Sequence, residues 1–330
     1  MPEKPGSTVE VAIAICAYMA CSSCALVANK VVMTYLQAPG LVFFIQLLAT
    51  VAFIAVGSAL KLIDVDKITW DNVKAFLPYI ASFVLCLYSN GKALAVSNIE
   101  TVIVFRACTP LCVCVLDYLL LDREFPSLQS LAALFGVVIG AVMYVQADGQ
   151  FALSGIAAYK WVTINLFGIV FEMVYGKALI SGISFKNPVW GAVLYTNLLA
   201  LLPMASLGGT EIFTFDVRTL TTAGLAWLAL SCVIGTGISW ATWNCRNKTS
   251  ATVFTLLGVV CKFMSVLMNI MLWDKHATNK GLLALAVCLV ASSMYRQAPK
   301  RSHAEPKATP DLEVQLPALN EKGAANEPED

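Results

Sequence analysis

Apolar stretches dominate the chain from residue 11 to residue 296, and short polar segments interrupt them at fairly regular intervals. A helix needs about 20 apolar residues to cross the hydrocarbon core of a bilayer. The lengths of the stretches and the lack of sustained apolar-polar alternation favour helices over barrel strands. We therefore predict ten membrane-spanning helices, at 11–29, 41–60, 75–97, 99–121, 127–145, 155–176, 189–207, 222–244, 251–273 and 281–296.

The composition agrees with this pattern. The 330 residues are 58% hydrophobic and 13% charged, and the mean hydropathy is +0.73, whereas soluble domains carry about 25% charged residues. The sequence thus predicts an all-α polytopic membrane protein. Lys and Arg lie mostly on one side of the predicted spans, which places both termini in the cytosol. Residues 1–10 form a cytosolic N-terminus, and residues 297–330, rich in Pro, Glu, Lys and Ala, form a disordered cytosolic tail.

The two halves of the chain repeat one plan. In residues 101–144 and again in 252–295, an apolar stretch ends in an acidic-basic pair, Asp122-Arg123 or Asp274-Lys275, and a second apolar stretch ends in Met-Tyr. This spacing predicts two five-helix repeats, 11–145 and 146–296. Because five is odd, the second repeat is inverted in the membrane. Inverted repeats are typical of secondary transporters, which bind substrate near the midplane between the halves.

Ionisable residues within spans are functional candidates because charge is costly there. Lys262 lies eleven residues from either end of its stretch, and Arg106 lies at the corresponding level of the fourth stretch. Two such cations would flank a central cavity that suits a phosphorylated anion. An alternative is that either cation pairs with Asp117 or Glu172 as an internal strut. Three further lysines are close enough to span ends for their ammonium groups to reach the interface, namely Lys30, Lys160 and Lys177.

Hydroxyl and amide side chains interrupt several of the predicted helices. Such groups could read a base edge or sugar hydroxyls, and the alternative for each is a hydrogen bond between helices. The candidates are Tyr18, Asn29, Tyr195, Asn197, Ser239 and Thr242.

Metal and enzyme chemistry are not expected. The eleven cysteines lie mostly in apolar stretches and only two histidines are present, so metal binding is disfavoured. The sequence shows no His pair, no HExxH motif and no Ser/His/Asp set. No cofactor and no nucleic-acid partner are predicted, and the oligomeric state is left open between a monomer and a homodimer.

Several short segments carry a family resemblance. They are ALVANK (25–30), VFRACTPL (104–111), LYTNLLA (194–200), GVVCK (258–262) and LWDKHAT (272–278). Over about residues 11–296 the chain resembles the nucleotide-sugar transporters of the drug/metabolite transporter superfamily, nearest to the Golgi GDP-mannose and GDP-fucose transporters, including the plant GDP-fucose type. The resemblance implies a fold of ten helices in two inverted repeats.

The resemblance also implies site residues. The family has a Phe-Tyr-Asn-Asn motif on its seventh helix, where this chain keeps Tyr195 and Asn197 but has Thr196 in place of the first Asn. It has a Gly-Ala-Leu-Asn-Lys motif on its ninth helix, where this chain keeps Gly258 and Lys262 but has Cys261 in place of Asn.

By this resemblance, Lys262 engages the diphosphate and Gly258 lets the sugar approach the backbone. Asn197, Ser239 and Thr242 lie toward guanine. Tyr18 occupies a matching place on the first helix, and Phe254 stands where a substrate-facing Tyr is expected. The remaining candidates for substrate binding are Asn29, Lys30, Arg106, Thr196 and Cys261.

The activity implied is antiport. A GDP-sugar, GDP-fucose or GDP-mannose, would pass from the cytosol to the Golgi lumen in exchange for GMP. Two alternatives stay open: transport of another nucleotide sugar such as a UDP-linked one, and a plastid-type phosphate translocator. The lost asparagines leave guanine specificity and the identity of the sugar open, because Thr196 and Cys261 have less hydrogen-bonding capacity than an amide.

Overall fold

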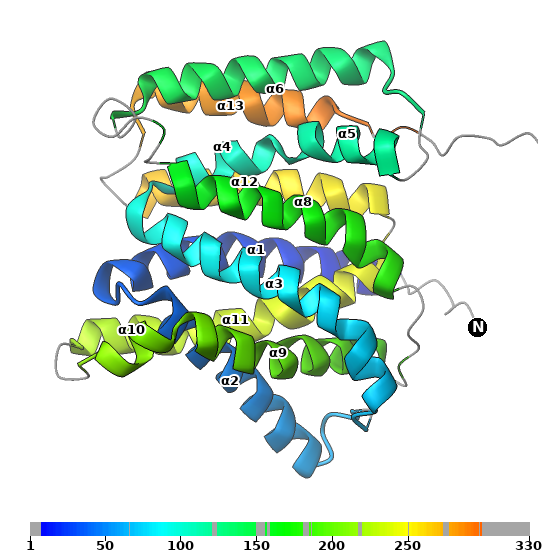
Figure 1. The fold of residues 1–330 in the computed structure, drawn as a ribbon, viewed down its shortest axis with the longest axis vertical. Coiled ribbons are helices and arrows are strands. Elements are labelled where there is room, and N and C mark those ends of the chain that lie inside the picture. The colour runs from blue at the N-terminus through cyan, green and yellow to red at the C-terminus, as the bar shows by residue number, and fades with distance from the viewer. Residues whose placement is uncertain are drawn as a thin grey trace, which may run out of the picture.

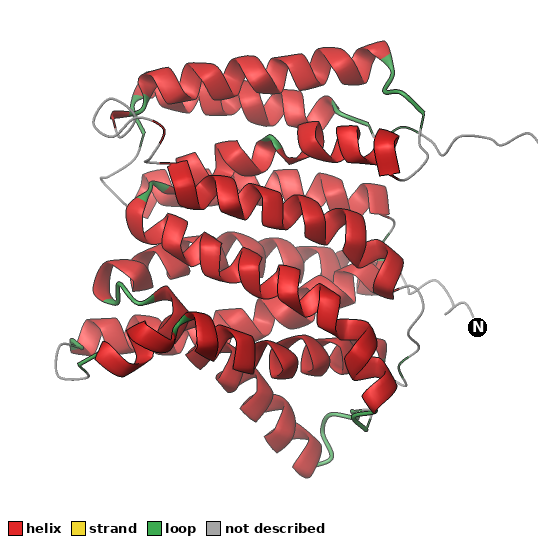
Figure 2. Cartoon of the chain, in the orientation of Figure 1, coloured by secondary structure: helices red, strands yellow, loops and turns green. Residues whose placement is uncertain are grey.

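The computed structural model describes residues 8–65, 67–120, 124–149, 156, 159–180, 185, 187–216, 220–249, 251–272, 277–296 and 298. Regular secondary structure in these residues is helical throughout (Figure 2). The α-helices are α1 (Thr8–Tyr35), α2 (Pro39–Ala59), α3 (Trp70–Val96), α4 (Ile99–Ala107), α5 (Thr109–Leu120), α6 (Leu128–Ala147), α8 (Lys160–Ile180), α9 (Pro188–Leu207), α10 (Gly209–Thr214), α11 (Thr222–Lys248), α12 (Ala251–Leu272) and α13 (Asn279–Met294).

Helical segments occur within each predicted stretch, and the protein is an all-helical polytopic membrane protein. In the described part of the chain, seven helices are long and apolar enough to cross a bilayer. Six of them begin at Thr8, Pro39, Trp70, Leu128, Val189 and Thr222, and the seventh span, Ile99–Leu116, is made by α4 together with most of α5. Val260–Leu272 and Asn279–Met294 are shorter apolar helices. That all ten predicted stretches cross the membrane, in two inverted repeats, stays a prediction.

The predicted stretch 99–121 differs from a single helix. It is divided at Cys108 into α4 and α5. Pro110 explains the interruption, because proline has no backbone N–H to donate to the carbonyl four residues earlier and its ring crowds that turn. The carbonyl that loses this bond belongs to Arg106, a residue singled out by the sequence.

Local sequence signals set several helix starts. The side chains of Ser127, Asn187, Thr221 and Thr278 each accept a hydrogen bond from a backbone N–H in the first turn of α6, α9, α11 and α13. Such caps satisfy donors that a helix start otherwise leaves unpaired. They fix where the helices enter the bundle.

The helices form one elongated bundle (Figure 1). At one end of its long axis α6 and α13 lie side by side, with α4 and α5 next to them. Gly140 makes this pairing tight, because a Cβ there would meet the backbone nitrogen of Cys288 at 2.8 Å. Large apolar side chains such as Phe135 and Val142 of α6 point outward and are exposed, as expected for a surface that faces lipid tails.

Toward the other end lie α2, α9, α10 and α11, with α1, α3, α8 and α12 between the two groups (Figure 1). The helices α1, α2, α3, α9 and α11 pack against one another in this region. They enclose the cavity described below.

Candidate functional site

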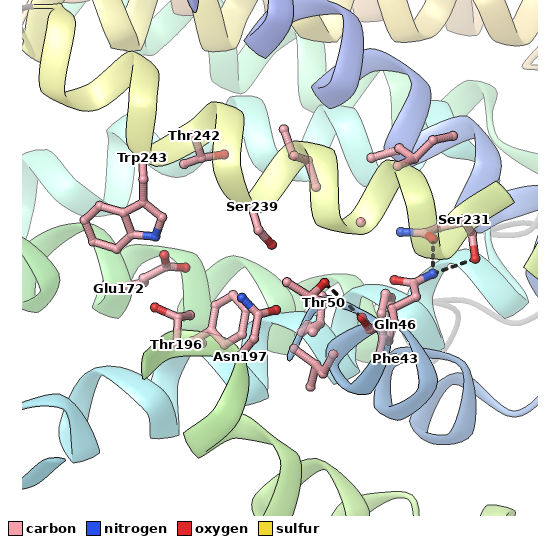
Figure 3. Close-up of a pocket in the computed structure, with 18 of the residues that line it drawn as sticks. Phe43, Gln46, Thr50, Glu172, Thr196, Asn197, Ser231, Ser239, Thr242 and Trp243 are labelled. Carbon is pink, nitrogen blue, oxygen red and sulfur yellow. Dashed lines mark hydrogen bonds between the residues drawn. The ribbon is translucent and has the colours of Figure 1, made fainter. Parts of the chain in front are cut away.

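A cavity of about 190 Å³ lies among α1, α2, α3, α8, α9 and α11 (Figure 3). Most of its lining side chains are buried or half-buried, whereas Arg246 near the end of α11 is exposed. The lining extends along α11 from Ser231, which is buried, to Arg246, which is exposed, and we call these two ends the inner end and the mouth. The lining residues are Ala25, Asn29, Phe43, Gln46, Leu47, Thr50, Tyr79, Phe83, Leu87, Glu172, Thr196, Asn197, Ser231, Ile234, Gly235, Ile238, Ser239, Thr242, Trp243 and Arg246.

The mouth combines an aromatic ring with both signs of charge. The guanidinium carbon of Arg246 lies 5.8 Å from the centre of the Trp243 ring, within range of a cation-π contact. The carboxylate of Glu172 accepts a hydrogen bond of 3.2 Å from the hydroxyl of Tyr79. A ligand that enters here meets a flat apolar face next to polar groups.

The middle of the cavity carries hydrogen-bonding groups that the protein itself does not fully use. Thr196 is 4% exposed, and its hydroxyl has no hydrogen-bond partner among the described residues. The amide nitrogen of Asn197 donates to the carbonyl of Val193 at 2.8 Å, which leaves its carbonyl oxygen for another donor. Ser239 and Thr242 face them from α11 (Figure 3). A buried hydroxyl without a partner is costly, so this region is suited to a polar ligand.

The inner end holds a network centred on Gln46. Its amide nitrogen donates to the side-chain oxygen of Asn29 and to the hydroxyl of Ser231, both at 2.9 Å. One turn further along α2, Thr50 shares a hydrogen bond of 2.9 Å with Thr236 of α11. These bonds join α1 and α2 to α11. They leave the side-chain oxygen of Gln46 at the cavity wall.

Arg106 and Lys262 lie together but do not line this cavity. The ammonium of Lys262 contacts the Arg106 carbonyl at 3.4 Å, the carbonyl that Pro110 cannot engage. The guanidinium of Arg106 donates to the side-chain oxygen of Asn90 at 3.0 Å, and its buried Nε has no partner in the described part of the chain. Within the described residues no carboxylate lies at ion-pair distance from either cation.

The alternative of an internal strut receives no support from Glu172, whose recorded hydrogen bond is to Tyr79. The side chain of Asp117, the other proposed partner, lies outside the described residues. The two cations thus form a positively charged cluster beside the break between α4 and α5.

Two predicted site residues make contacts within the fold instead. The hydroxyl of Tyr195, 1% exposed, accepts from the backbone N–H of Thr69 at 2.8 Å and donates to the carbonyl of Lys67 at 3.3 Å. The ammonium of Lys30 donates to the carbonyls of Leu94 and Ser97, each at 2.7 Å. Lys30 therefore caps the carboxyl end of α3, where a cation is favourable.

The other candidates lie near α12. The Cys261 carbonyl accepts a hydrogen bond of 3.3 Å from the Ser23 hydroxyl, which joins α12 to α1. A Cβ on Gly258 would meet no described atom within 4 Å. Tyr18 is half-buried on α1. The side chain of Phe254 lies outside the described residues, as do those of Lys177 and its neighbours in the last turns of α8.

The sequence reasoning did not single out Gln46, Thr50, Ser231 or Trp243. A signal for them exists: Gln46 and Thr50 are four residues apart on α2, and Ser231, Ser239, Thr242 and Arg246 recur on one face of α11. In the described part of the chain, no group of three or more His, Cys, Asp or Glu side chains is placed to hold a metal ion.

Comparison with known proteins shows which proteins this chain is similar to. No family model matches it. It is 39% identical over 298 residues to GDP-fucose transporter 1 of Arabidopsis thaliana, an alignment that covers 86% of this chain and 84% of the relative. It is 34% identical to GDP-mannose transporter GONST3 of the same organism, over 89% of this chain and 80% of that one.

More distant matches agree. A GDP-mannose transporter of Yarrowia lipolytica is 24% identical over 87% of this chain and 93% of the relative. A solved crystal structure at 15% identity aligns with a TM-score of 0.56 over 88% of this chain and 98% of that one, which shows a shared fold alone. These sequence relatives are named as transporters rather than enzymes. The chain belongs to the family of nucleotide-sugar transporters that includes the GDP-fucose and GDP-mannose transporters.

Proposed function

We propose that this protein exchanges a GDP-sugar, GDP-fucose or GDP-mannose, for GMP across the Golgi membrane by alternating access. The observation that carries the proposal is a GDP-fucose transporter 39% identical over 86% of the chain. The buried, incompletely hydrogen-bonded cavity between the helices supports it. Both termini face the cytosol in this proposal, and the GDP-sugar moves from cytosol to lumen.

The architecture proposed is ten spanning helices in two inverted repeats of five. In this scheme α6 and α13 are the last helices of the two repeats, and α4 with α5 corresponds to α12. The close pairing of α6 with α13 supports the scheme, because equivalent helices related by a pseudo-twofold axis meet at that axis. The cavity then lies between first-half helices α1, α2 and α3 and second-half helices α8, α9 and α11.

Within the site, the guanine lies against Asn197, Ser239 and Thr242, and the hydroxyl of Thr196 supplies one further hydrogen bond. The diphosphate interacts with Lys262 and Arg106. A phosphate oxygen accepts from an ammonium or a guanidinium in a charge-assisted bond. It also supplies a counter-ion for these two cations, which have no carboxylate at ion-pair distance within the described residues.

The cavity as described is too small for the whole ligand. Its volume of about 190 Å³ is below the range of roughly 300–1,000 Å³ for small-molecule pockets. Binding must therefore widen the cavity from α11 toward α12, where Gly258 and the Lys262 ammonium lie.

Exchange follows if the ligand-bound carrier changes conformation faster than the empty one. GMP and a GDP-sugar share the guanine, the ribose and one phosphate, so both can occupy the same polar groups. A ligand shifts a conformational equilibrium only by its difference in affinity for the two states. Antiport therefore requires that both ligands favour the occluded state.

One observation favours a second substrate class. Thr196 and Cys261 stand where the family resemblance has asparagines, and each side chain has less hydrogen-bonding capacity than an amide. A UDP-linked sugar is therefore the second candidate, with the same fold and the same phosphate contacts.

A binding panel tests the proposal. The melting temperature of the purified protein is measured with GMP, UMP, CMP or AMP, for the wild type, Ser239→Ala and the control Ser206→Ala. Ser206 is exposed on α9 and donates to the carbonyl of Leu202. We expect GMP to stabilise the wild type and Ser206→Ala most strongly and Ser239→Ala less. If UMP alone stabilised the protein, the proposed substrate would change from a GDP-sugar to a UDP-sugar.

A further inference from the structure

A second polar cluster lies away from the cavity, around the short helix α10. The carboxylate of Glu211 accepts a hydrogen bond of 2.7 Å from the backbone N–H of Gly40 and one of 3.2 Å from the hydroxyl of Tyr88. It also forms an ion pair with Lys92, and the two side chains are only 13% and 24% exposed, respectively. We call Gly40, Tyr88, Lys92 and Glu211 the Glu211 cluster.

The backbones approach closely at the same place. Gly208 precedes α10, and a Cβ on Gly208 would lie 2.8 Å from the Cα of Gly40, closer than real side-chain contacts. Gly209, the next residue, has open space, because a Cβ there would meet nothing within 4 Å. The contact between the start of α2 and the end of α9 therefore requires glycine at position 208 but not at position 209.

The cluster lies beyond the inner end of the cavity. Along α2, Gln46 is six residues beyond Gly40, about 9 Å at the rise of an α-helix. Along α3, Leu87 lines the cavity and Tyr88 belongs to the cluster. Arg246 lies near the carboxyl end of α11, whereas Glu211 belongs to α10, which shortly precedes α11 in the chain and lies beside its amino end (Figure 1).

The contacts of the cluster join the two halves of the chain. Gly40, Tyr88 and Lys92 belong to the first half, and Glu211 belongs to the second. The cap that Lys30 provides to α3 is different, since it joins α1 to α3 within the first half. Movement of one half against the other would leave the Lys30 cap intact but separate Glu211 from its three donors.

We infer that the Glu211 cluster is the gate that closes the far side of the site, the side opposite Arg246, while the mouth at Arg246 is open. The inference rests on the proposed transport function. It adds the residues that stabilise one of the two conformations of the alternating-access cycle. Closure places the carboxylate of Glu211 on Lys92, Tyr88 and the Gly40 N–H, and packs Gly208 on Gly40. Opening breaks these contacts and exposes the inner end of the cavity on that side.

The test is GMP/GMP exchange in liposomes, together with the rise in melting temperature caused by GMP, for Gly208→Ala and its control Gly209→Ala. The added methyl of Gly208→Ala prevents closure and holds the carrier open on the far side. We expect exchange to fall by at least about tenfold while GMP still stabilises the protein. Gly209→Ala should exchange within about twofold of the wild type, because it leaves this equilibrium unchanged.

Two outcomes would overturn the inference. Normal exchange by Gly208→Ala would show that the close approach is not needed for the cycle. Joint loss of exchange and of stabilisation by GMP would assign the glycine to packing alone. Absence of GMP exchange by the wild type would instead overturn the proposed function, so the two failures are distinguishable.

A second variant tests the ion pair without adding volume. Glu211→Gln keeps the shape and an acceptor oxygen for the Gly40 N–H but removes the charge that pairs with Lys92. We expect exchange to fall at least about threefold with GMP stabilisation retained, since the closed state loses population. Exchange equal to that of the wild type would overturn the role of the ion pair, whatever the folding of Gly208→Ala.

Discussion

Replacing Lys262 with methionine should separate ligand binding from folding. Among the described residues, the hydrogen bond of its ammonium is to the Arg106 carbonyl at 3.4 Å, and it lies beside the guanidinium of the same residue. In the proposed transport cycle its partner is the diphosphate of the substrate. Lys262→Met should therefore lower transport strongly and leave the empty protein as stable as before or more stable.

The magnitudes follow from these contacts. A hydrogen bond of 3.4 Å is at the outer limit of the geometry, so its loss costs at most about 1 kcal/mol. Removing a desolvated charge without a counter-ion is favourable by a similar or larger amount. A hydrogen bond to a charged group is worth about 1.5–3 kcal/mol, which corresponds to a rise in KM of roughly 10–150-fold.

The assay compares Lys262→Met with Lys30→Met. Each is measured for melting temperature without ligand and for the KM of GDP-sugar uptake. Lys30 makes two bonds of 2.7 Å to carbonyls at the end of α3, and their loss leaves both acceptors without that donor. We expect Lys30→Met to lower stability by about 2–4 kcal/mol with little change in KM, the opposite of the result for Lys262→Met.

The reasoning would be refuted by the reverse pattern. If Lys262→Met melted at a clearly lower temperature and transported with the wild-type KM, the ammonium would be a structural group. If Lys30→Met folded normally but lost affinity, the predicted role of Lys30 in substrate binding would be supported instead.

Three further substitutions test individual contacts. Gln46→Leu removes both amide bonds at the inner end, and should lower the melting temperature and raise the KM of uptake roughly tenfold. Tyr195→Phe removes the hydroxyl bonds to Thr69 and Lys67, and should cost about 1–2 kcal/mol of stability with an unchanged KM. A raised KM at normal stability would instead show that this hydroxyl contacts the substrate. Gly140→Val crowds Cys288 and should cost about 1–3 kcal/mol, measured by thermal unfolding against Gly149→Ala, whose added methyl meets open space.

The positions of the helices could be predicted because apolar length is a strong signal in a membrane protein. The interruption at Cys108 was not predicted, although Pro110 is visible in the sequence. Hydropathy does not distinguish a continuous helix from one interrupted by proline, since both keep the apolar stretch. The interruption leaves the Arg106 carbonyl to the ammonium of Lys262, the group that we propose binds the diphosphate.

Part of the site could be predicted and part could not. Asn29, Thr196, Asn197, Ser239 and Thr242 line the cavity as expected of polar residues within spans. Tyr195, next to Thr196 in the sequence, points instead to the loop before α3. A motif gives residue types and spacing but not the face of the helix that meets a neighbour.

Gln46 and Lys30 show that the tertiary partners of a side chain also could not be predicted from the sequence. Gln46 was missed because its partners Asn29 and Ser231 lie on two other helices. Lys30 was a substrate candidate because charge within a span is a functional signal. Its actual acceptors are carbonyls that become available only where α3 ends beside α1.

Uptake of labelled nucleotide sugars into liposomes that hold the purified protein tests the central claim most directly. The liposomes are preloaded with GMP, UMP, CMP or AMP. We predict that GMP-loaded liposomes alone take up substrate, and that the substrate is GDP-fucose or GDP-mannose. Uptake of a UDP-sugar into UMP-loaded liposomes, without GDP-sugar uptake, would contradict guanine recognition by a site that carries Thr196 and Cys261.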